Sequence, residues 1–384
     1  LKRGGPVVPV ERDRRKARIA RWDGIAAALF LTFALLYFLG RLQGNFPIVL
    51  LGGAASNVAS YAAARNLPEL FVGDPALGDS NAAGVYATVH IPLIQALATA
   101  AGDYGLAYTW LLLPHIFLHL LGYYILGRVL FKNRLWAFVF AWLTGMMVID
   151  VGLGEFWGLW RDALPRFTFQ TLLPYLLALA VHWKEQPRRW PWLMAMAGLL
   201  VYAHPISAPT WGFALWLGLW LFHPKGWGWR RRILSMLGLG ALFLVMLLPF
   251  ALNYLSYQVG GQAADVATVR TILETYYPAD LLNPLAAFGN FALAMSKNLL
   301  IPLALAGLAA AWWLLRGQRS LLKLALAWAA GIAVVTMVVP SIERVVEQAL
   351  HILPLETEFV RGIRYFVPLL LIFWVWPFAL LVPR

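Results

Sequence analysis

Three acidic residues and two prolines lie close together in "NLPELFVGDPALGDSN", residues 66–81, between two apolar runs. An acid-bearing, helix-breaking stretch is costly beside lipid unless it lies in water or lines a site. Asp74 follows Gly73, which leaves room for a ligand to approach the chain, and precedes Pro75, which favours extended backbone. Asp74 and Asp79 are therefore candidate site residues. The alternative is ordinary turn chemistry, in which an aspartate caps a turn or a helix, and it is stronger for Asp79.

Four arginines have the chemistry to bind a phosphate group. Arg161 and Arg166 lie on either side of Asp162 in "WRDALPRF". Arg361 and Arg364, in "RGIR", have the spacing that places two residues on one helix face. A planar guanidinium group binds phosphate through two parallel hydrogen bonds. The alternative for both pairs is ion pairing with neighbouring acids, with side chains that extend to the membrane interface.

Histidines are a second kind of candidate. His204, in "YAHPIS", could bind ligand hydroxyl groups or a phosphate, or could complete a turn by satisfying free carbonyl groups. His115 and His119 lie four residues apart inside an apolar run, where a buried ionisable pair raises the question of haem or a metal ion. No carboxylate accompanies them, so hydrogen bonding between helices is the favoured interpretation and no metal ligand is predicted.

The composition indicates an integral membrane protein. Of the 384 residues, 61% are hydrophobic and 13% are charged, whereas soluble domains average about a quarter charged. The 19 tryptophans and 14 tyrosines suit belts at two membrane interfaces. The absence of cysteine excludes disulfides and thiolate metal sites. The net charge of +13 would indicate a nucleic-acid partner in a soluble protein, but here it fits an anionic lipid leaflet better.

Ten apolar runs of about membrane-spanning length predict an all-α integral membrane protein with about ten transmembrane helices. The runs lack the period-2 alternation of strands, and they are too long to be strands, so no strands are predicted. They cover residues 24–40, 105–127, 135–153, 167–183, 190–204, 206–222, 233–253, 298–315, 321–339 and 364–382.

The distribution of charge predicts the orientation. If the ten spans alternate from a cytoplasmic N-terminus, most of the 31 basic residues fall on the cytoplasmic side, as the positive-inside rule requires. Only four acids fall on that side: Glu11, Asp13, Asp23 and Glu185. We therefore predict a multi-pass protein of the cell membrane with both termini in the cytoplasm.

This topology divides the chain into a basic cytoplasmic segment, residues 1–23, and a polytopic domain, residues 24–384. The outer loops are residues 41–104, 254–297 and 340–363. The first contains two stretches too apolar for a free loop, which predict two helices lying at the outer surface. The second could cover a site as a lid.

The chain resembles the GT-C superfamily of membrane glycosyltransferases, which take sugars from polyprenyl-phosphate donors. The resemblance rests on "SNVASYAAARNLPELFVGDPALGDSNAAGVYATVHIPLIQAL", "RDALPRFTFQTLLPYLLAL" and "GLLVYAHPIS". It covers about the first 220 residues and is architectural: a cytoplasmic N-terminus, about ten helices, and two surface helices with a catalytic acid in the first outer loop.

The resemblance implies roles for the candidate residues. Asp74, or else Asp79, would deprotonate the acceptor hydroxyl, while Arg161, Arg166, Arg361 and Arg364, with His204, would bind the lipid phosphate as it leaves. Asp74 is then expected to face a cavity that it shares with the arginines. The family's acid usually begins an Asp-x-x-x-Tyr element, which here aligns with Asn57 to Tyr61, and an amide is no general base. A divalent cation is the one cofactor left open.

Two other functions stay open beside sugar transfer. Because Asn57 stands at the position of the family's catalytic acid, the chain could also be a non-catalytic GT-C-like scaffold or complex subunit. A transporter or flippase of a lipid-linked anion would need arginines along a path rather than at one end. Membrane lipids, a polyprenyl-phosphate-linked sugar and other membrane proteins are the expected partners, and nucleic acid is not.

Overall fold

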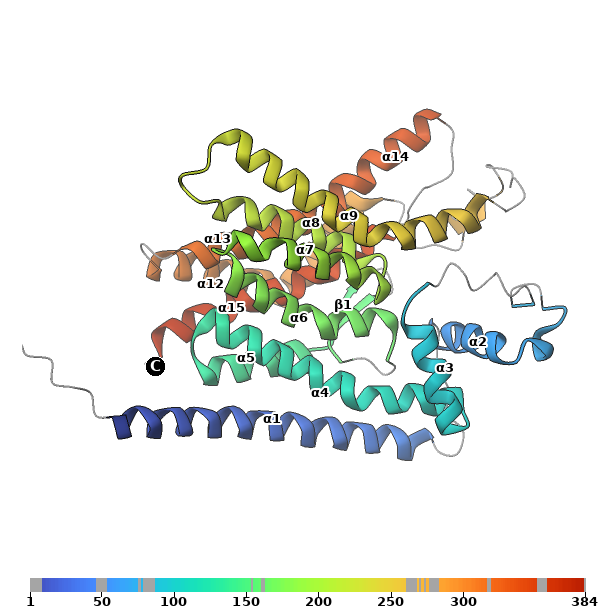
Figure 1. Ribbon diagram of the computed structural model, residues 1–384, viewed down its shortest axis with the longest axis horizontal. Coiled ribbons are helices and arrows are strands. Elements are labelled where there is room, and N and C mark those ends of the chain that lie inside the picture. Colours follow the sequence, from blue (N-terminus) through green and yellow to red (C-terminus); the bar gives the residue numbers. More distant parts are fainter. Residues whose placement is uncertain are drawn as a thin grey trace, which may run out of the picture.

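The computed structural model describes residues 9–45, 54–74, 77–78, 87–152, 155–159, 163–259, 268, 271–272, 274–275, 283–315, 319–350 and 358–382. Helices dominate, and most of them lie along one direction, with the start of α1 and the C-terminus at the same end (Figure 1). Helices α2 and α3 lie at the opposite end (Figure 1). The chain is therefore an all-α protein of membrane type in its main elements.

The helices follow the apolar runs of the sequence. In chain order they are α1 (Pro9–Asn45), α2 (Ala54–Asn66), α3 (His90–Ala101), α4 (Tyr104–Phe131), α5 (Arg134–Met146), α6 (Pro165–Trp183), α7 (Trp190–Leu199), α8 (Ser207–Leu219), α9 (Trp229–Val259), α11 (Pro284–Lys297), α12 (Leu300–Leu314), α13 (Ser320–Ala333), α14 (Val339–Leu350) and α15 (Phe366–Leu381). Short 3₁₀ segments follow α7 (η4, Leu200–Tyr202) and precede α15 (η8, Phe359–Tyr365).

Each of the ten predicted runs overlaps a helix, but fewer helices are long enough to cross a membrane alone. Five helical segments within the described part of the chain have the length and hydropathy of a span, and a sixth arises if α11 and α12, bent by 80°, count as one. The five are Arg21–Gln43, Tyr104–Phe131, Trp229–Ser256, Ser320–Leu350 and Phe359–Leu381. The predicted runs at 190–204 and 206–222 are helical as α7 with η4 and as α8 with η5 (Trp220–Phe222), and the chain turns between them at Ala203–Ile206.

One predicted apolar run ends in a short hairpin of strands and not in a helix. Strands β1 (Ile149–Gly152) and β2 (Glu155–Trp157) pair antiparallel, so the predicted run 135–153 leaves its helix at Met146. Strands this short carry no readable alternation. Gly152 has φ +81°, which favours glycine, and its N–H donates to Asp150 Oδ1 at 2.8 Å. Trp157 then anchors the hairpin by donating from Nε1 to the Thr144 carbonyl at 3.0 Å.

The predicted third outer loop, 340–363, also begins differently. The helix of α13 continues through a π-helical turn, η7 (Val334–Val338), into α14, so residues 340–350 are helical. A π-helical turn adds a residue to the helix without ending it, which hydropathy alone does not show. Much of the predicted lid, 254–297, lies outside the described residues, although α9 extends to Val259 and α11 begins at Pro284.

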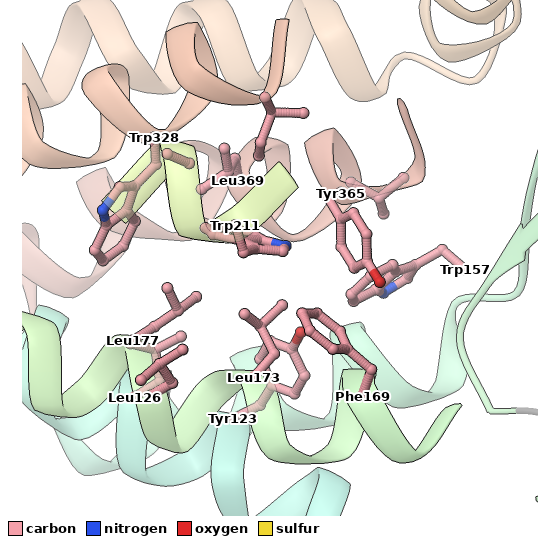
Figure 2. Close-up of a cluster of buried hydrophobic side chains, with 14 of the residues drawn as sticks. Tyr123, Leu126, Trp157, Phe169, Leu173, Leu177, Trp211, Trp328, Tyr365 and Leu369 are labelled. Atoms are coloured by element: carbon pink, nitrogen blue, oxygen red, sulfur yellow. The ribbon is translucent and has the colours of Figure 1, made fainter. Parts of the chain in front are cut away.

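Aromatic side chains and close helix contacts fill the core. Four buried rings contact one another in a chain: Trp157 on β2, Tyr365 at the end of η8, Trp211 on α8 and Trp328 on α13 (Figure 2). A Cβ at Gly331 would lie 2.5 Å from the Ala214 Cα, so a glycine is needed where α13 meets α8. Small residues at such crossings are the usual means of packing helices in membranes.

The two helices expected in the first outer loop are present as α2 and α3. Gln95 on α3 donates to Asn66 Oδ1 at 2.7 Å, and Asn66 donates to the Tyr104 hydroxyl at 2.8 Å. The Val89 N–H donates to the Tyr202 carbonyl at 2.8 Å. The pair is thereby attached to α4 and to the connection between α7 and α8, which brings it beside the candidate site.

Candidate functional site

A cavity of about 170 Å³ lies at the end of the bundle opposite the C-terminus. Five described segments distant in sequence form it: α2, Thr88 just before α3, the start of α6, the connection between α7 and α8, and η8 with Glu358 before it. Its polar lining includes Arg166, His204, Glu358, Arg361 and Arg364, and its apolar lining includes Val58, Leu164, Pro165 and Ile206. The cavity therefore combines cationic and apolar surface.

The start of α6 positions Arg166. Pro165 occupies the first helical position, where its missing N–H costs nothing, and Leu164 before it has extended backbone. The N–H groups of Phe167 and Thr168 both donate to the Leu164 carbonyl, at 2.9 and 3.0 Å. Arg166 thus lies in the first turn of α6, where the helix dipole also favours negative charge.

The connection between α7 and α8 positions His204. Its N–H donates to the Leu200 carbonyl at 3.0 Å, which closes η4. Its Nδ1 lies 3.3 Å from the Ser207 N–H and 2.8 Å from Ser207 Oγ. Because a backbone N–H can only donate, Nδ1 is an acceptor and the proton of the neutral ring is on Nε2.

Ser207 links His204 to η8. Its hydroxyl oxygen accepts from Arg364 Nη2 at 3.2 Å and from the Tyr365 hydroxyl. The Ser207 O–H then donates to His204 Nδ1, so the hydroxyl donates one hydrogen bond and accepts two. A buried hydrogen-bond network of this kind restricts the direction of its members.

The two arginines of η8 differ in burial. Arg364 is 1% exposed and lies against the Tyr365 ring, 5.2 Å from its centroid. Arg361 is more open, and its Nη1 lies 2.8 Å from Glu358 Oε1. Gly362 between them packs closely, because a Cβ there would lie 2.7 Å from the Thr336 methyl group. The ion-pair alternative considered for Arg361 is therefore present, with Glu358 as the partner.

The lining of the cavity is rich in positive charge. Burial, and then the charges of Arg364, Arg166 and Arg361, lower the pKa of His204 well below its ordinary value of 6.5. His204 is therefore neutral at physiological pH and presents Nε2–H as a donor. Among the described residues, three guanidinium groups and one carboxylate, Glu358, line the cavity, which suits an anionic group with several oxygen acceptors.

The structure brings together four of the seven predicted site residues: Arg166, His204, Arg361 and Arg364. Asp74 is exposed and is not among the residues lining this cavity. Its Oδ1 accepts from the Leu77 N–H at 2.9 Å, the turn chemistry considered as its alternative. Arg161 and Asp79 lie outside the described residues. The catalytic roles of Asp74 and Asp79 stay predictions.

Comparison with known proteins adds no relative. No protein-family model, curated protein or solved structure matches this chain. What the site can do must therefore be argued from its own residues.

Three contributors to the site have weak signals in the sequence. Ser207 and Tyr365 each follow a predicted residue closely, in "HPIS" and "RGIRY", but nothing marks them as partners across 158 residues. Val58 shows that α2 borders the cavity, one residue after Asn57, which is itself exposed. Contacts between such distant segments depend on helix packing, which hydropathy does not specify.

His115 and His119 lie apart from this cavity. His115 Nε2 is 2.8 Å from the Thr168 hydroxyl on α6, which is the interhelical hydrogen bond that the sequence favours. His119 is fully buried among Tyr123, Trp157 and Phe167. No group of three or more metal-ligating side chains occurs within the described residues.

Proposed function

We propose that the chain is a membrane glycosyltransferase that binds the phosphate of a polyprenyl-phosphate sugar in this cavity. The observation that carries the proposal is the convergence of Arg166, Arg361 and Arg364 in one cavity that also has apolar walls. A lipid phosphate matches both kinds of lining, because its phosphate is an anion that accepts several hydrogen bonds and its hydrocarbon chain is apolar. Guanidinium groups fixed before the reaction stabilise the charge that develops on the departing phosphate.

In the proposed reaction an acceptor hydroxyl oxygen forms a bond to the anomeric carbon of the sugar. The bond from that carbon to the phosphate oxygen breaks, and the electron pair leaves with the polyprenyl phosphate. The acceptor proton passes to a carboxylate. Asp74 and Asp79, in the segment after α2, remain the predicted bases, and a divalent cation remains open as a helper.

A topology of ten spans with both termini in the cytoplasm is part of the proposal. It is supported by the basic residues near the end of the bundle that holds the C-terminus, such as Arg128, Lys132 and Arg134. The chain has no cysteine, so single cysteines at positions 79 and 231 can be labelled without background. They should react from opposite sides of the membrane, and equal accessibility would contradict the topology.

A non-catalytic relative of the GT-C enzymes is the second candidate, because Asn57 stands where the family has its acid. It would use the same cavity to hold a lipid phosphate for a partner enzyme. A transporter is less well supported, since the arginines gather at one end of the bundle rather than along a path.

Transfer from a radiolabelled polyprenyl-phosphate sugar to a panel of acceptors, with protein in liposomes, tests the proposal. Wild-type protein should release polyprenyl phosphate and Arg364→Gln should not. If both bind the lipid phosphate equally well, the proposed site is wrong. Binding that depends on Arg364 without transfer would favour the non-catalytic candidate.

A further inference from the structure

A second amphiphilic groove lies on the surface of the bundle, far from the outer cavity. It has a volume of about 390 Å³ and runs between α1 and α5. Its apolar walls include Trp22, Ile25 and Leu29 from α1, and Leu135 and Phe138 from α5. Trp22, Leu29 and Leu135 are 55%, 48% and 59% exposed, so this surface is open to the bilayer along the candidate span Arg21–Gln43.

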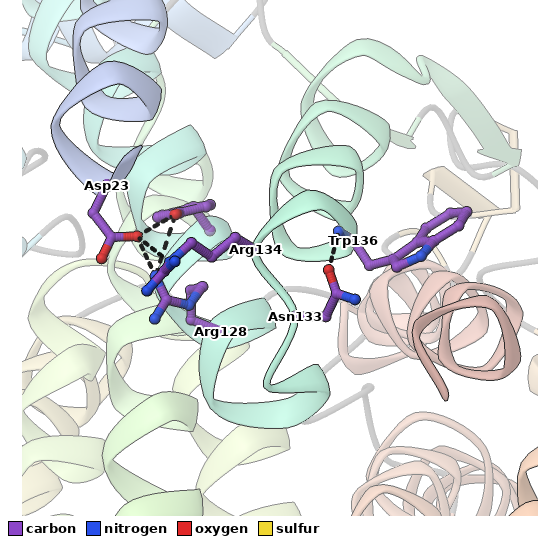
Figure 3. Close-up of polar contacts among 6 residues, drawn as sticks. Asp23, Arg128, Asn133, Arg134 and Trp136 are labelled. Atoms are coloured by element: carbon purple, nitrogen blue, oxygen red, sulfur yellow. Dashed lines mark hydrogen bonds and ion pairs between the residues drawn. The ribbon is translucent and has the colours of Figure 1, made fainter. Parts of the chain in front are cut away.

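A charged cluster, drawn in Figure 3, contributes two residues to the lining of the groove. Asp23 Oδ1 accepts from the Tyr124 hydroxyl at 2.5 Å and from Arg128, and it forms an ion pair with Arg134 Nε at 3.6 Å. Tyr124 and Arg134 also line the groove. Two guanidinium groups share one carboxylate, which leaves the cluster with one surplus positive charge.

Arg134 is the group that faces the groove from this cluster. Asn133 caps α5 by accepting from the Trp136 N–H at 3.3 Å, which places Arg134 in the first turn of α5 (Figure 3). Its Nε is buried beside the Asp23 carboxylate, 3.6 Å from Oδ1, while the side chain as a whole is 33% exposed. Arg134 therefore keeps donors for a ligand besides its ion pair with Asp23.

The position of the cluster defines the depth of the groove. Asp23 lies at the start of the span in α1, Arg128 in the last turn of α4, and Arg134 at the start of α5. The connection between α4 and α5 carries Lys132 as well and no acid. This is the level at which lipid headgroups meet a protein, and its positive charge favours an anionic headgroup over a zwitterionic one, whose ammonium would be repelled.

We propose that this groove binds one anionic glycerophospholipid of the cytoplasmic leaflet. Its phosphate lies at Arg134, and one acyl chain lies along Ile25, Leu29 and Phe138. The lipid covers the gap between α1 and α5 and joins them beside the ring contacts of Phe30 with Phe138 and Trp142 and of Phe33 with Trp142. The site is independent of the proposed glycosyl transfer.

Native mass spectrometry of protein extracted from mixed phosphatidylglycerol and phosphatidylcholine vesicles tests this site. Wild-type protein should retain one phosphatidylglycerol in preference. Arg134→Gln should lower that preference about fivefold, the effect of one basic residue at a lipid surface. Lys132→Gln is the matched control, because it removes the same charge from the same connection without touching the groove, and it should leave the preference unchanged.

Two further variants separate binding from folding. Arg134→Lys keeps the charge and the ion pair and should retain most of the preference. Leu29→Trp fills the exposed groove without disturbing the charge and should reduce retention of both lipids at the site. Equal retention by wild type and Arg134→Gln would overturn the proposal. So would an equal loss in Arg134→Gln and Lys132→Gln, which would show only general attraction, or a second protein helix cross-linked into the groove.

Discussion

The two ends of this molecule both hold clusters of arginine, but the clusters differ in burial. At the end near the C-terminus, the side chains of Arg128 and Arg134 are 28% and 33% exposed and share Asp23, itself 35% exposed. At the other end, Arg364 is 1% exposed and is held by Ser207 inside a cavity. The open cluster adjoins an apolar groove on the surface, and the closed one adjoins apolar walls within the bundle.

This difference separates two uses of the same side chain. An exposed ion pair is screened by water and salt and stabilises a protein little. A buried guanidinium group is costly to desolvate and interacts strongly with any anion that reaches it. Substitutions in the cavity should therefore have large effects on ligand binding, whereas substitutions at Asp23 should have small effects on stability.

The largest effect is expected from Arg364→Gln. Loss of a buried charged donor should weaken binding of a polyprenyl phosphate by about 2–3 kcal/mol, roughly 30- to 150-fold. Isothermal titration in detergent measures it. Arg188→Gln removes an exposed charge from the connection between α6 and α7 and should leave affinity unchanged. Equal losses in both variants would mean that net charge rather than the cavity governs binding.

Ser207→Ala should have the next largest effect. It removes the oxygen that accepts from Arg364 and Tyr365, so the guanidinium group is no longer fixed in direction. We expect affinity for the lipid phosphate to fall by about 1–1.5 kcal/mol, roughly tenfold. Ser256→Ala is the control, since that exposed hydroxyl bonds only the Asn253 carbonyl of its own helix in the described contacts. If Ser207→Ala binds the lipid phosphate as tightly as the wild type, Ser207 does not contribute to the site.

Stability should depend on pH through His204. Its native pKa is lowered by burial and by the nearby arginines, so between that pKa and 6.5 the unfolded chain binds more protons than the native protein. Stability contributed by the neutral ring is present above pH 6.5 and is lost as the pH falls. From pH 7.5 to 5.5 the loss should be on the order of 1 kcal/mol.

Thermal unfolding of His204→Gln measures this contribution, because the variant should lose that much less stability over the same range. His182→Gln, an exposed position on α6, should keep the wild-type pH dependence. If His204→Gln also keeps the wild-type pH dependence, then burial and the nearby arginines do not lower the pKa of His204 in the native protein.

The smallest effect is expected from Asp23→Asn. Its partners are partly exposed, so the free energy of unfolding should change by about 1 kcal/mol or less. The variant should lose that small stability in low salt and less in high salt, measured by thermal unfolding. A loss of several kcal/mol would place this cluster in the same class as Arg364 and would remove the contrast between the two ends.

The sequence predicts the arginine cavity better than the catalytic acid, for a physical reason. Arg166, Arg361 and Arg364 flank apolar runs, so the ends of the helices place them at one level of the bundle. His204 is fixed in the same way by the turn at Pro205. Asp74 lies in a long segment between α2 and α3, where no periodicity constrains direction, and its described contact is the turn at Leu77.

Helix ends are harder to predict than helix existence. The hairpin of β1 and β2 depends on Gly152 and on the anchor at Trp157, and α14 depends on a π-helical turn that hydropathy averages over. The pairing of Arg361 with Glu358 was open beforehand, because several acids lay within reach in sequence. Only packing of η8 against α8 and η7 decides it.

The most direct test of the central claim is electron cryo-microscopy of the protein in lipid nanodiscs with a polyprenyl phosphate. We expect phosphate density in the cavity within hydrogen-bonding distance of Arg166, Arg361 or Arg364, with the hydrocarbon chain leaving along apolar walls. Density for the lipid only elsewhere, with the cavity free of phosphate at saturating concentration, would contradict it.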